Sequence, residues 1–349
     1  MTDRWRRRAV RAVRVAALGA IAYFGAALVA IHWPRPGPFE PRPAPNDVEA
    51  QASLAATSDA IGRVFEARDG ASLHSTVHAA TADPSAPADA PVVLLLHGVT
   101  ASAAVLDRPA RKMAASIGAS VIALDLRGHG RSGGAPFDVA YLGQYEHDVA
   151  DVVAALRRER ASRPIVLAGH SMGGGIALRY ALLRDAPAVD GYLLIAPLLG
   201  GGAPSMRRPT AAQAQANDHV RIHIARLVGL FMLDAVAVRR FHHLPVLFFD
   251  TPSGMPGYTF FALGSMQPNA PLDYAAALRA VDAPLLVVAG GSDATFRAAA
   301  YPSIVREHSA GESLVVAGES HVGILESPPA LERIRAWLPR RGSGGEVAR

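Results

Sequence analysis

The sequence contains no cysteine, and this absence excludes three kinds of chemistry. A chain without thiols forms no disulfide, holds no metal through thiolate ligands and has no cysteine nucleophile. Lysine is nearly absent as well, because Lys112 is the only one among 35 basic residues. Charged residues make up 19% of the chain and apolar residues 50%, so global disorder is excluded and a substantial buried core is predicted.

The excess of positive charge is confined to one end of the chain. The net charge is +5, and residues 1–14 hold six arginines against Asp3. The remainder of the chain holds equal numbers of basic and acidic residues, so it offers no overall field that would attract a polyanion. The composition therefore argues against a nucleic-acid partner.

A long apolar run follows the arginines and predicts a membrane-spanning segment. Residues 15–33 (VAALGAIAYFGAALVAIHW) contain no Asp, Glu, Lys or Arg. Nineteen helical residues rise about 28 Å, close to the hydrocarbon thickness of a bilayer. We expect 1–14 to be a basic cytoplasmic segment and 15–33 a single-pass signal anchor in the inner membrane, with the rest of the chain outside the cytoplasm. The alternative is a cleaved signal and a secreted or periplasmic protein.

Beyond the apolar run, the sequence predicts a linker, a two-part core and a tail. Residues 34–60 are dense in proline and predict a linker, and residues 339–349 predict a disordered tail. Short apolar runs alternate with helical patterns through 61–197 and again through 283–338. This alternation is typical of an α/β fold, in which a mostly parallel sheet is flanked by helices.

The alternation lapses over residues 198–282, which predicts an insertion in the core. The insertion has a helical pattern over 220–233 and a loop-rich apolar part over 241–249. We expect it to form a cap, or lid, that provides one wall of an apolar pocket.

The stretch around Ser171 has the strongest chemical signature in the sequence. An apolar run at 165–168 ends in Gly169-His170-Ser171-Met172-Gly173, and a helical pattern over 176–183 follows. Strand, glycine-flanked turn and helix form the setting of a serine nucleophile, since small neighbours leave room for the sharp turn. The free N–H groups at the start of the helix point toward that serine. Ser171 is therefore the predicted nucleophile.

Two further residues stand where the nucleophile needs a base and an orienting acid. Asp293 follows the predicted strand 285–289, and His321 follows the predicted strand 313–317. Their position at strand ends and the chain order Ser, Asp, His match a catalytic triad. We expect His321 to act as general base and acid, and Asp293 to fix the tautomer of His321.

An oxyanion hole requires two N–H donors near the nucleophile. The backbone N–H of Met172, directly after the nucleophile, is predicted to be one donor. Val99, in the loop after the strand 92–96, is predicted to supply the other. His97 and Gly98 are expected to shape this loop on the substrate side, together with His170.

Taken together, these motifs resemble the α/β-hydrolase superfamily. The residues that carry the resemblance are His97-Gly98, Asp125-Leu126-Arg127-Gly128-His129-Gly130-Arg131-Ser132, Gly169-His170-Ser171-Met172-Gly173-Gly174, Gly290-Gly291-Ser292-Asp293 and His321. The chain is most similar to the branch of monoacylglycerol lipases and lysophospholipases, over roughly residues 61–338. The resemblance implies the α/β-hydrolase fold with an eight-stranded, mostly parallel sheet, and neither a metal nor an organic cofactor. The acidic residue that often follows the HG pair in monoacylglycerol lipases is missing here, which leaves the substrate open.

Several functions are compatible with these residues. The first hypothesis is a serine ester hydrolase for a small-molecule acyl ester, lipid-derived because of the apolar cap and the membrane segment. An aminopeptidase similar to proline iminopeptidases and an acyltransferase are alternatives on the same triad. A non-catalytic binding protein on a hydrolase fold is disfavoured, because all three triad residues are present. The sequence does not decide the oligomeric state.

Overall fold

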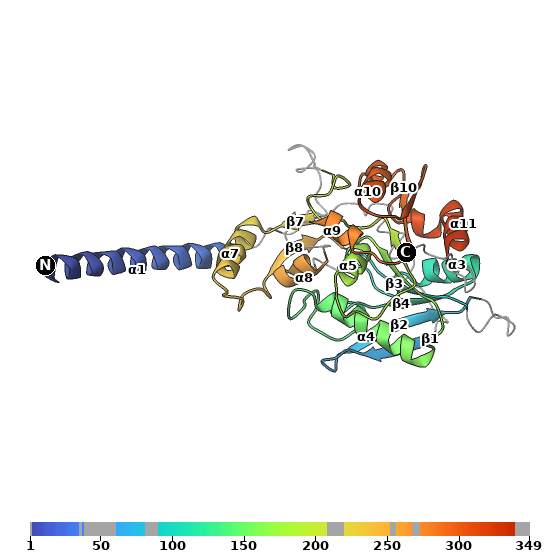
Figure 1. Ribbon diagram of the computed structural model, residues 1–349, viewed down its shortest axis with the longest axis horizontal. Coiled ribbons are helices and arrows are strands. Elements are labelled where there is room, and N and C mark those ends of the chain that lie inside the picture. Colours follow the sequence, from blue (N-terminus) through green and yellow to red (C-terminus); the bar gives the residue numbers. More distant parts are fainter. Residues whose placement is uncertain are drawn as a thin grey trace, which may run out of the picture.

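Continuous apolar runs in the sequence form the centre of a mixed sheet (Figure 1). The computed structural model describes residues 2–34, 37, 61–80, 90–207, 220–251, 256–266 and 273–338. The predicted linker over 34–60 therefore lies almost entirely outside the described residues, and the predicted tail over 339–349 lies wholly outside them.

The central sheet has eight strands in the order β1-β2-β4-β3-β5-β6-β10-β11. Its strands are β1 (Ile61–Glu66), β2 (Ser72–His78), β3 (Val92–Leu96), β4 (Ser120–Leu124), β5 (Ile165–His170), β6 (Gly191–Ile195), β10 (Leu285–Gly290) and β11 (Glu312–Val316). Every neighbouring pair from β4 to β11 is parallel, whereas β1 and β2 form an antiparallel edge. The predicted fold class, an eight-stranded and mostly parallel α/β sheet, is confirmed.

Helices cover both faces of the sheet. Alternate residues of the central strands point to opposite faces, so the apolar side chains of one strand enter two separate cores. Leu94 and Leu96 of β3 pack in one core with α4 (Gln144–Glu159), α5 (Met172–Ala181), α9 (Tyr274–Arg279) and α10 (Tyr301–His308). Val93 and Leu95 pack in a second core with α3 (Asp107–Ile117) and α11 (Pro328–Trp337). Two 3-10 turns, η1 (Ala298–Ala300) and η2 (Gly323–Glu326), complete these layers. Burial on both faces explains why β3 reads as an unbroken apolar run.

The insertion between β6 and β10 contains its own small sheet. Its elements before α9 are β7 (Val220–Ile222), α7 (Ile224–Ala235), β8 (Pro245–Phe249), β9 (Gly257–Thr259) and α8 (Phe260–Ser265), and β7, β8 and β9 pair antiparallel. The helical pattern over 220–233 was wrong at its start, because Val220–Ile222 pairs with β8 and the helix begins only at Ile224. The apolar part over 241–249 is likewise a strand in its second half.

The helix α1 (Thr2–His32) projects from the rest of the molecule (Figure 1). Its 31 residues correspond to about 46 Å of helix. Within it, Arg4–His32 is long and apolar enough to cross a bilayer. Most of its side chains are exposed, and its C-terminal end packs against α7. A membrane anchor and a signal sequence share this length and composition.

Candidate active site

Ser171 occupies a strained turn between β5 and α5. Its φ of 53° and ψ of −115° lie in a region that few residues other than glycine adopt. The turn is tight because a methyl group on Gly169 would lie 2.2 Å from the backbone of Gly173. A methyl group on Gly173 would in turn lie 2.4 Å from the carbonyl oxygen of Leu96. The glycines on either side of Ser171 are therefore required by close packing, and α5 starts at Met172, four residues before the predicted helical pattern.

Asp293 and His321 are brought together at the carboxyl ends of β10 and β11. The Nδ1 atom of His321 lies 2.7 Å from Oδ2 of Asp293. The other oxygen of Asp293 accepts the backbone N–H groups of Thr295 and Phe296, at 2.7 and 2.8 Å. Asp293 is 1% exposed, and this burial opposes its charged form. The hydrogen bonds and the charge of His321 outweigh burial, so the pKa of Asp293 lies below its usual value.

His170 links this pair to the turn at Ser171. Its Nε2 donates to the backbone carbonyl of His321 at 2.9 Å, and the two rings are 4.8 Å apart. Burial, followed by the proximity of His321, lowers the pKa of His170 to about 3, so the ring is neutral. The residue that immediately precedes Ser171 therefore holds the His321 backbone in place.

The loop after β3 approaches Ser171 closely. A methyl group on Gly98 would lie 3.2 Å from Cβ of Ser171, so glycine permits this approach. The N–H groups of Val99 and Met172 donate to no hydrogen bond within the described part of the chain. His97 is fully buried, and its ring accepts the N–H of Leu126 and donates to the carbonyl of Gly98. Its ring therefore supports the loop from inside.

A tyrosine of the cap reaches the same loop, and sequence patterns did not identify it. The hydroxyl oxygen of Tyr258, on β9, accepts the N–H of Thr100 at 2.7 Å. The hydroxyl also lies 2.8 Å from Nε2 of His129, and Nδ1 of His129 lies 2.9 Å from the carbonyl of Arg127. Because that carbonyl only accepts, Nδ1 carries the proton and Nε2 accepts from Tyr258. Burial, and then the nearby His97, lowers the pKa of His129 to about 3, which keeps the ring neutral.

The glycine-rich loop at 125–133 is structural rather than a phosphate cradle. Asp125 accepts the N–H groups of Ala103 and Arg131, at 2.6 and 3.0 Å, and thereby ties the loop to the turn before α3. The buried Arg127 forms ion pairs with Asp148 and Asp69, at 2.6 and 2.9 Å. These contacts fill the interior of the loop with protein groups. No group of three or more potential metal ligands occurs among the described residues.

Part of the chain matches a known protein family. Residues 87–244 match the family described as "Serine aminopeptidase, S33". This range contains Gly98 and Ser171 and ends before Asp293 and His321.

Two curated relatives are similar over about a third of the chain. The monoacylglycerol lipase of Mycolicibacterium smegmatis is 34% identical over 117 residues, covering 31% of this chain and 41% of the lipase. Protein phosphatase methylesterase 1 of Mus musculus is 34% identical over 107 residues, covering 31% of this chain and 28% of the methylesterase. The chain thus matches less than half the length of either relative.

Two solved structures share the fold over a larger part of the chain. A thermophilic esterase from Thermogutta terrifontis has a TM-score of 0.52 and 21% identity, over 80% of this chain and 98% of the esterase. A membrane phospholipase A has a TM-score of 0.52 and 19% identity, over 95% of this chain and 97% of the phospholipase. At this identity the likeness concerns the fold, and it agrees with the sheet described above.

Proposed function

We propose that the chain is a serine ester hydrolase of the α/β-hydrolase superfamily, with Ser171 as nucleophile. The observation that carries the proposal is the hydrogen bond between the buried Asp293 and the partly buried His321, at the carboxyl end of the sheet where Ser171 occupies its strained turn. A histidine oriented by a carboxylate is the group that takes the proton of a serine hydroxyl.

The reaction proceeds in two acyl transfers. Ser171 Oγ attacks the acyl carbonyl while Nε2 of His321 takes its proton, and the alcohol then leaves with that proton. Water attacks the resulting acyl-enzyme, again with His321 as base, and the carboxylic acid is released. Asp293 accepts the Nδ1–H of His321 throughout and stabilises the imidazolium. The N–H groups of Met172 and Val99 bind the oxyanion, and each donor of this kind contributes roughly 100- to 1,000-fold in rate.

A lipid-derived acyl ester is the proposed substrate. The apolar helix α1 supports this assignment, because a membrane anchor brings the site close to lipid. The names of two similar proteins, a monoacylglycerol lipase and a membrane phospholipase A, support it too. The match to the phospholipase covers 95% of this chain. The unmatched part is smaller than the segment 1–60, so the match includes part of this N-terminal region.

The packing of α1 supports an anchor that is retained. Ala27 and Ile31 of α1 are fully buried against Leu230 and Leu233 of the cap. Cleavage of a signal after Ala30 would remove Ala27 from this contact, leave Ile31 on a frayed end and expose part of the apolar side of α7 to water.

An aminopeptidase is the second candidate, because the matching family is described as a serine aminopeptidase. Such an enzyme needs a carboxylate that binds the free amino group of its substrate. Asp138 is bound to His243 and Thr259, both at 2.6 Å, and Asp234 is paired with Arg239. These carboxylates already have partners, which favours the ester.

The test is covalent labelling of the full-length protein in detergent micelles with a fluorophosphonate. The parent protein is expected to be labelled, Ser171→Ala is expected to be unlabelled, and the exposed-site control Ser303→Ala is expected to be labelled as the parent. Absence of label on the parent protein would overturn the proposal. A chain-length series of p-nitrophenyl esters, a monoacylglycerol and an aminoacyl amide then separates lipase, short-chain esterase and peptidase. Transfer of the acyl group to an added alcohol identifies an acyltransferase.

A further inference from the structure

The cap helix α7 carries a largely exposed apolar stripe, of which only Phe231 has a ring contact, edge-on to Phe260 at 5.0 Å. Ile224, Val228 and Phe231 are 60%, 51% and 58% exposed. Their spacing of four and three residues places them on one face of the helix. The residues Leu230 and Leu233, on the other side, are buried. A contiguous exposed apolar surface of this kind marks an interaction site.

The buried side of α7 lies against the C-terminal end of α1 (Figure 1), and hydrogen bonds at the two ends of the contact show that the helices run antiparallel. At one end of the contact, the ring of His223 donates to the carbonyl of Trp33 at 3.0 Å. At the other end, the hydroxyl of Tyr23 donates to the carbonyl of Met232 at 2.6 Å. Between them, a methyl group on Gly229 would lie 2.8 Å from a backbone oxygen of α1. The cap helix therefore follows α1 back from Trp33 to the level of Tyr23.

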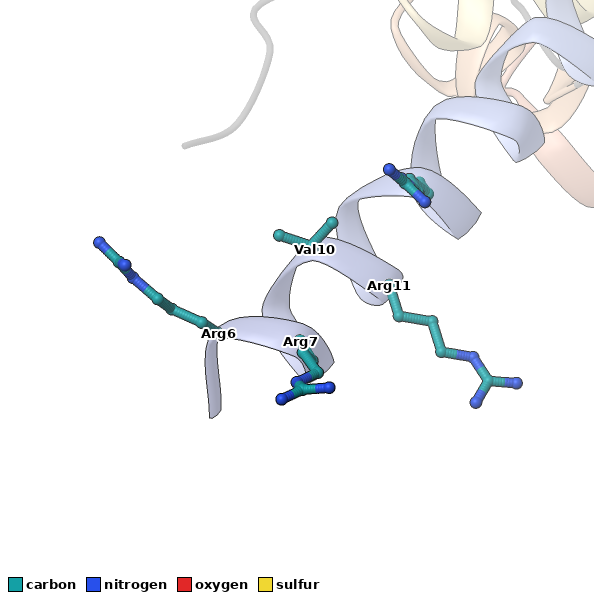
Figure 2. Close-up of a pocket in the computed structure, with 5 residues that line it drawn as sticks. Arg6, Arg7, Val10 and Arg11 are labelled. Carbon is teal, nitrogen blue, oxygen red and sulfur yellow. The ribbon is translucent and has the colours of Figure 1, made fainter. Parts of the chain in front are cut away.

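The arginines of α1 limit how this helix fits a bilayer. Figure 2 shows Arg6 and Arg11 extending away from the helix, and Arg14 is the last arginine of the cluster. From Val15 to Tyr23, where contact with α7 begins, the helix rises only about 13 Å. This is less than half of the ~30 Å of hydrocarbon that a span must cross. A membrane-spanning α1 therefore places its contact with α7 inside the bilayer.

The polar groups at the contact are paired, as a lipid environment requires. The last carbonyls of a helix have no partner within the helix. The Nε of Arg226 donates to the carbonyl of Ile31 at 3.0 Å, and the bond from His223 satisfies a second carbonyl at the same end. Toward the other end of α7, Asp234 is paired with Arg239 at 3.2 Å. The exposed positions of α7 itself are thus apolar, whereas Arg239 and Arg240, which follow the helix, are exposed.

We propose that α7 is a second membrane element, immersed beside α1 in the leaflet on the side of the hydrolase domain, with Ile224, Val228 and Phe231 against the acyl chains. The inference rests on the proposed function in one respect, the membrane span formed by α1. Because β8, β9 and α8 follow α7, the cap is seated on the bilayer. A lipid-derived ester in that leaflet reaches the cap without passing through bulk water.

The test exploits the absence of cysteine, which lets a single introduced thiol be labelled cleanly. The full-length protein is reconstituted in phosphatidylcholine vesicles, with an environment-sensitive NBD label at Val228→Cys or Phe231→Cys. Ile21→Cys, exposed on α1, is the reference within the bilayer, and Val64→Cys, exposed on β1, is the reference in water. Each sample is measured with and without lipids that carry a nitroxide on the acyl chain. We expect the two α7 labels to be blue-shifted and quenched as at Ile21, while the label at Val64 is unaffected.

Three results would overturn the inference, and they differ in what they say of α1. Quenching at Ile21 without quenching at Val228 and Phe231 would show that α1 lies in the bilayer and that α7 lies outside it. Absence of quenching at all sites shows that α1 does not span, so the membrane part of the proposed function fails as well. A blue shift at Phe231 that follows protein concentration and not nitroxide lipid identifies a second copy of the chain as the occupant.

A charge on the α7 face provides a functional test. We expect Phe231→Asp to hydrolyse a soluble short-chain ester as the parent does, and to lose activity toward a long-chain ester held in vesicles. Val64→Asp, an equally drastic change on β1, is expected to retain both activities. Equal loss of both activities in Phe231→Asp contradicts a membrane role. A parent protein without activity on the soluble ester contradicts the proposed esterase function instead, and leaves the labelling result valid.

Discussion

Tyr258 donates its hydroxyl proton to Nε2 of His129 across 2.8 Å, and this bond joins the insertion to the domain built on the eight-stranded sheet. Burial raises the pKa of Tyr258, so the phenol keeps its proton. The same oxygen accepts the N–H of Thr100, one residue after the proposed oxyanion donor Val99. Thr100 has a φ of 58°, which side chains rarely adopt, so the loop conformation depends on such support. The position of the insertion is therefore coupled to the geometry of the loop that carries Val99.

Tyr258→Phe is expected to lower kcat/KM by about tenfold, mainly through kcat, because the loop loses a hydrogen bond of about 1 kcal/mol and its donor geometry relaxes. Steady-state kinetics on a soluble ester measure this effect. The matched control is Tyr141→Phe, which removes an exposed tyrosine–histidine bond, to His147, and is expected to change little. A variant that lost only thermal stability, with kcat intact, would show a purely structural role.

Gly98→Ala is expected to reduce kcat by roughly tenfold or more, with a small change in Tm. Its methyl group would meet Cβ of Ser171 and Nδ1 of His170, both at 3.2 Å, and a displacement of a few tenths of an ångström misplaces the reacting groups. Gly62→Ala is the control, since a methyl group there finds only ordinary contacts. Unchanged kinetics in Gly98→Ala would contradict both the close fit of this loop to Ser171 and the proposed role of Ser171.

Arg127→Ala is expected to destabilise the fold by about 3–5 kcal/mol, because it leaves the buried carboxylate of Asp148 without its partner. The Arg127 side chain is 7% exposed and also pairs with Asp69. Arg63→Ala removes the exposed pair with Glu159 and is expected to cost about 1 kcal/mol or less. Chemical denaturation of both variants gives the two values, and equal losses would show that burial of the Arg127 pair is unimportant.

Stability is expected to fall as the pH drops below about 6.5, the usual pKa of a histidine in an unfolded chain. Burial lowers the pKa of His97 to about 4 and those of His129 and His170 to about 3. Between about pH 4 and pH 6.5 the unfolded chain binds more protons than the folded one, so the stability present above pH 6.5 is lost on acidification. Three such groups contribute about 4 kcal/mol per pH unit near pH 5.

Denaturation at about pH 7 and about pH 5 measures this slope. His129→Gln is expected to reduce this pH slope of the free energy of unfolding by the contribution of about one proton, independently of its effect on the absolute stability. A slope that is close to zero, or unchanged in His129→Gln, would show that these rings do not stay neutral in the folded protein.

Local sequence was sufficient for the elements whose residues are constrained by their neighbours. The buried strands β3, β5 and β10 are recognisable because both faces of each strand require apolar side chains. The sharp turn at Ser171 is recognisable because only glycine fits at Gly169 and Gly173. The cap was less predictable, since β7 and β8 are stabilised by pairing with each other across more than twenty residues.

The sequence by itself determined the parallel sheet, the strained serine turn and the order of Ser171, Asp293 and His321, because each rests on short-range sterics or on chain order. Only the tertiary structure decided that Tyr258 reaches a loop 158 residues away and that α7 packs along α1. The physical reason is that these contacts join segments with no common periodicity, and their hydrogen bonds exist only once the sheet has brought both segments to the same edge.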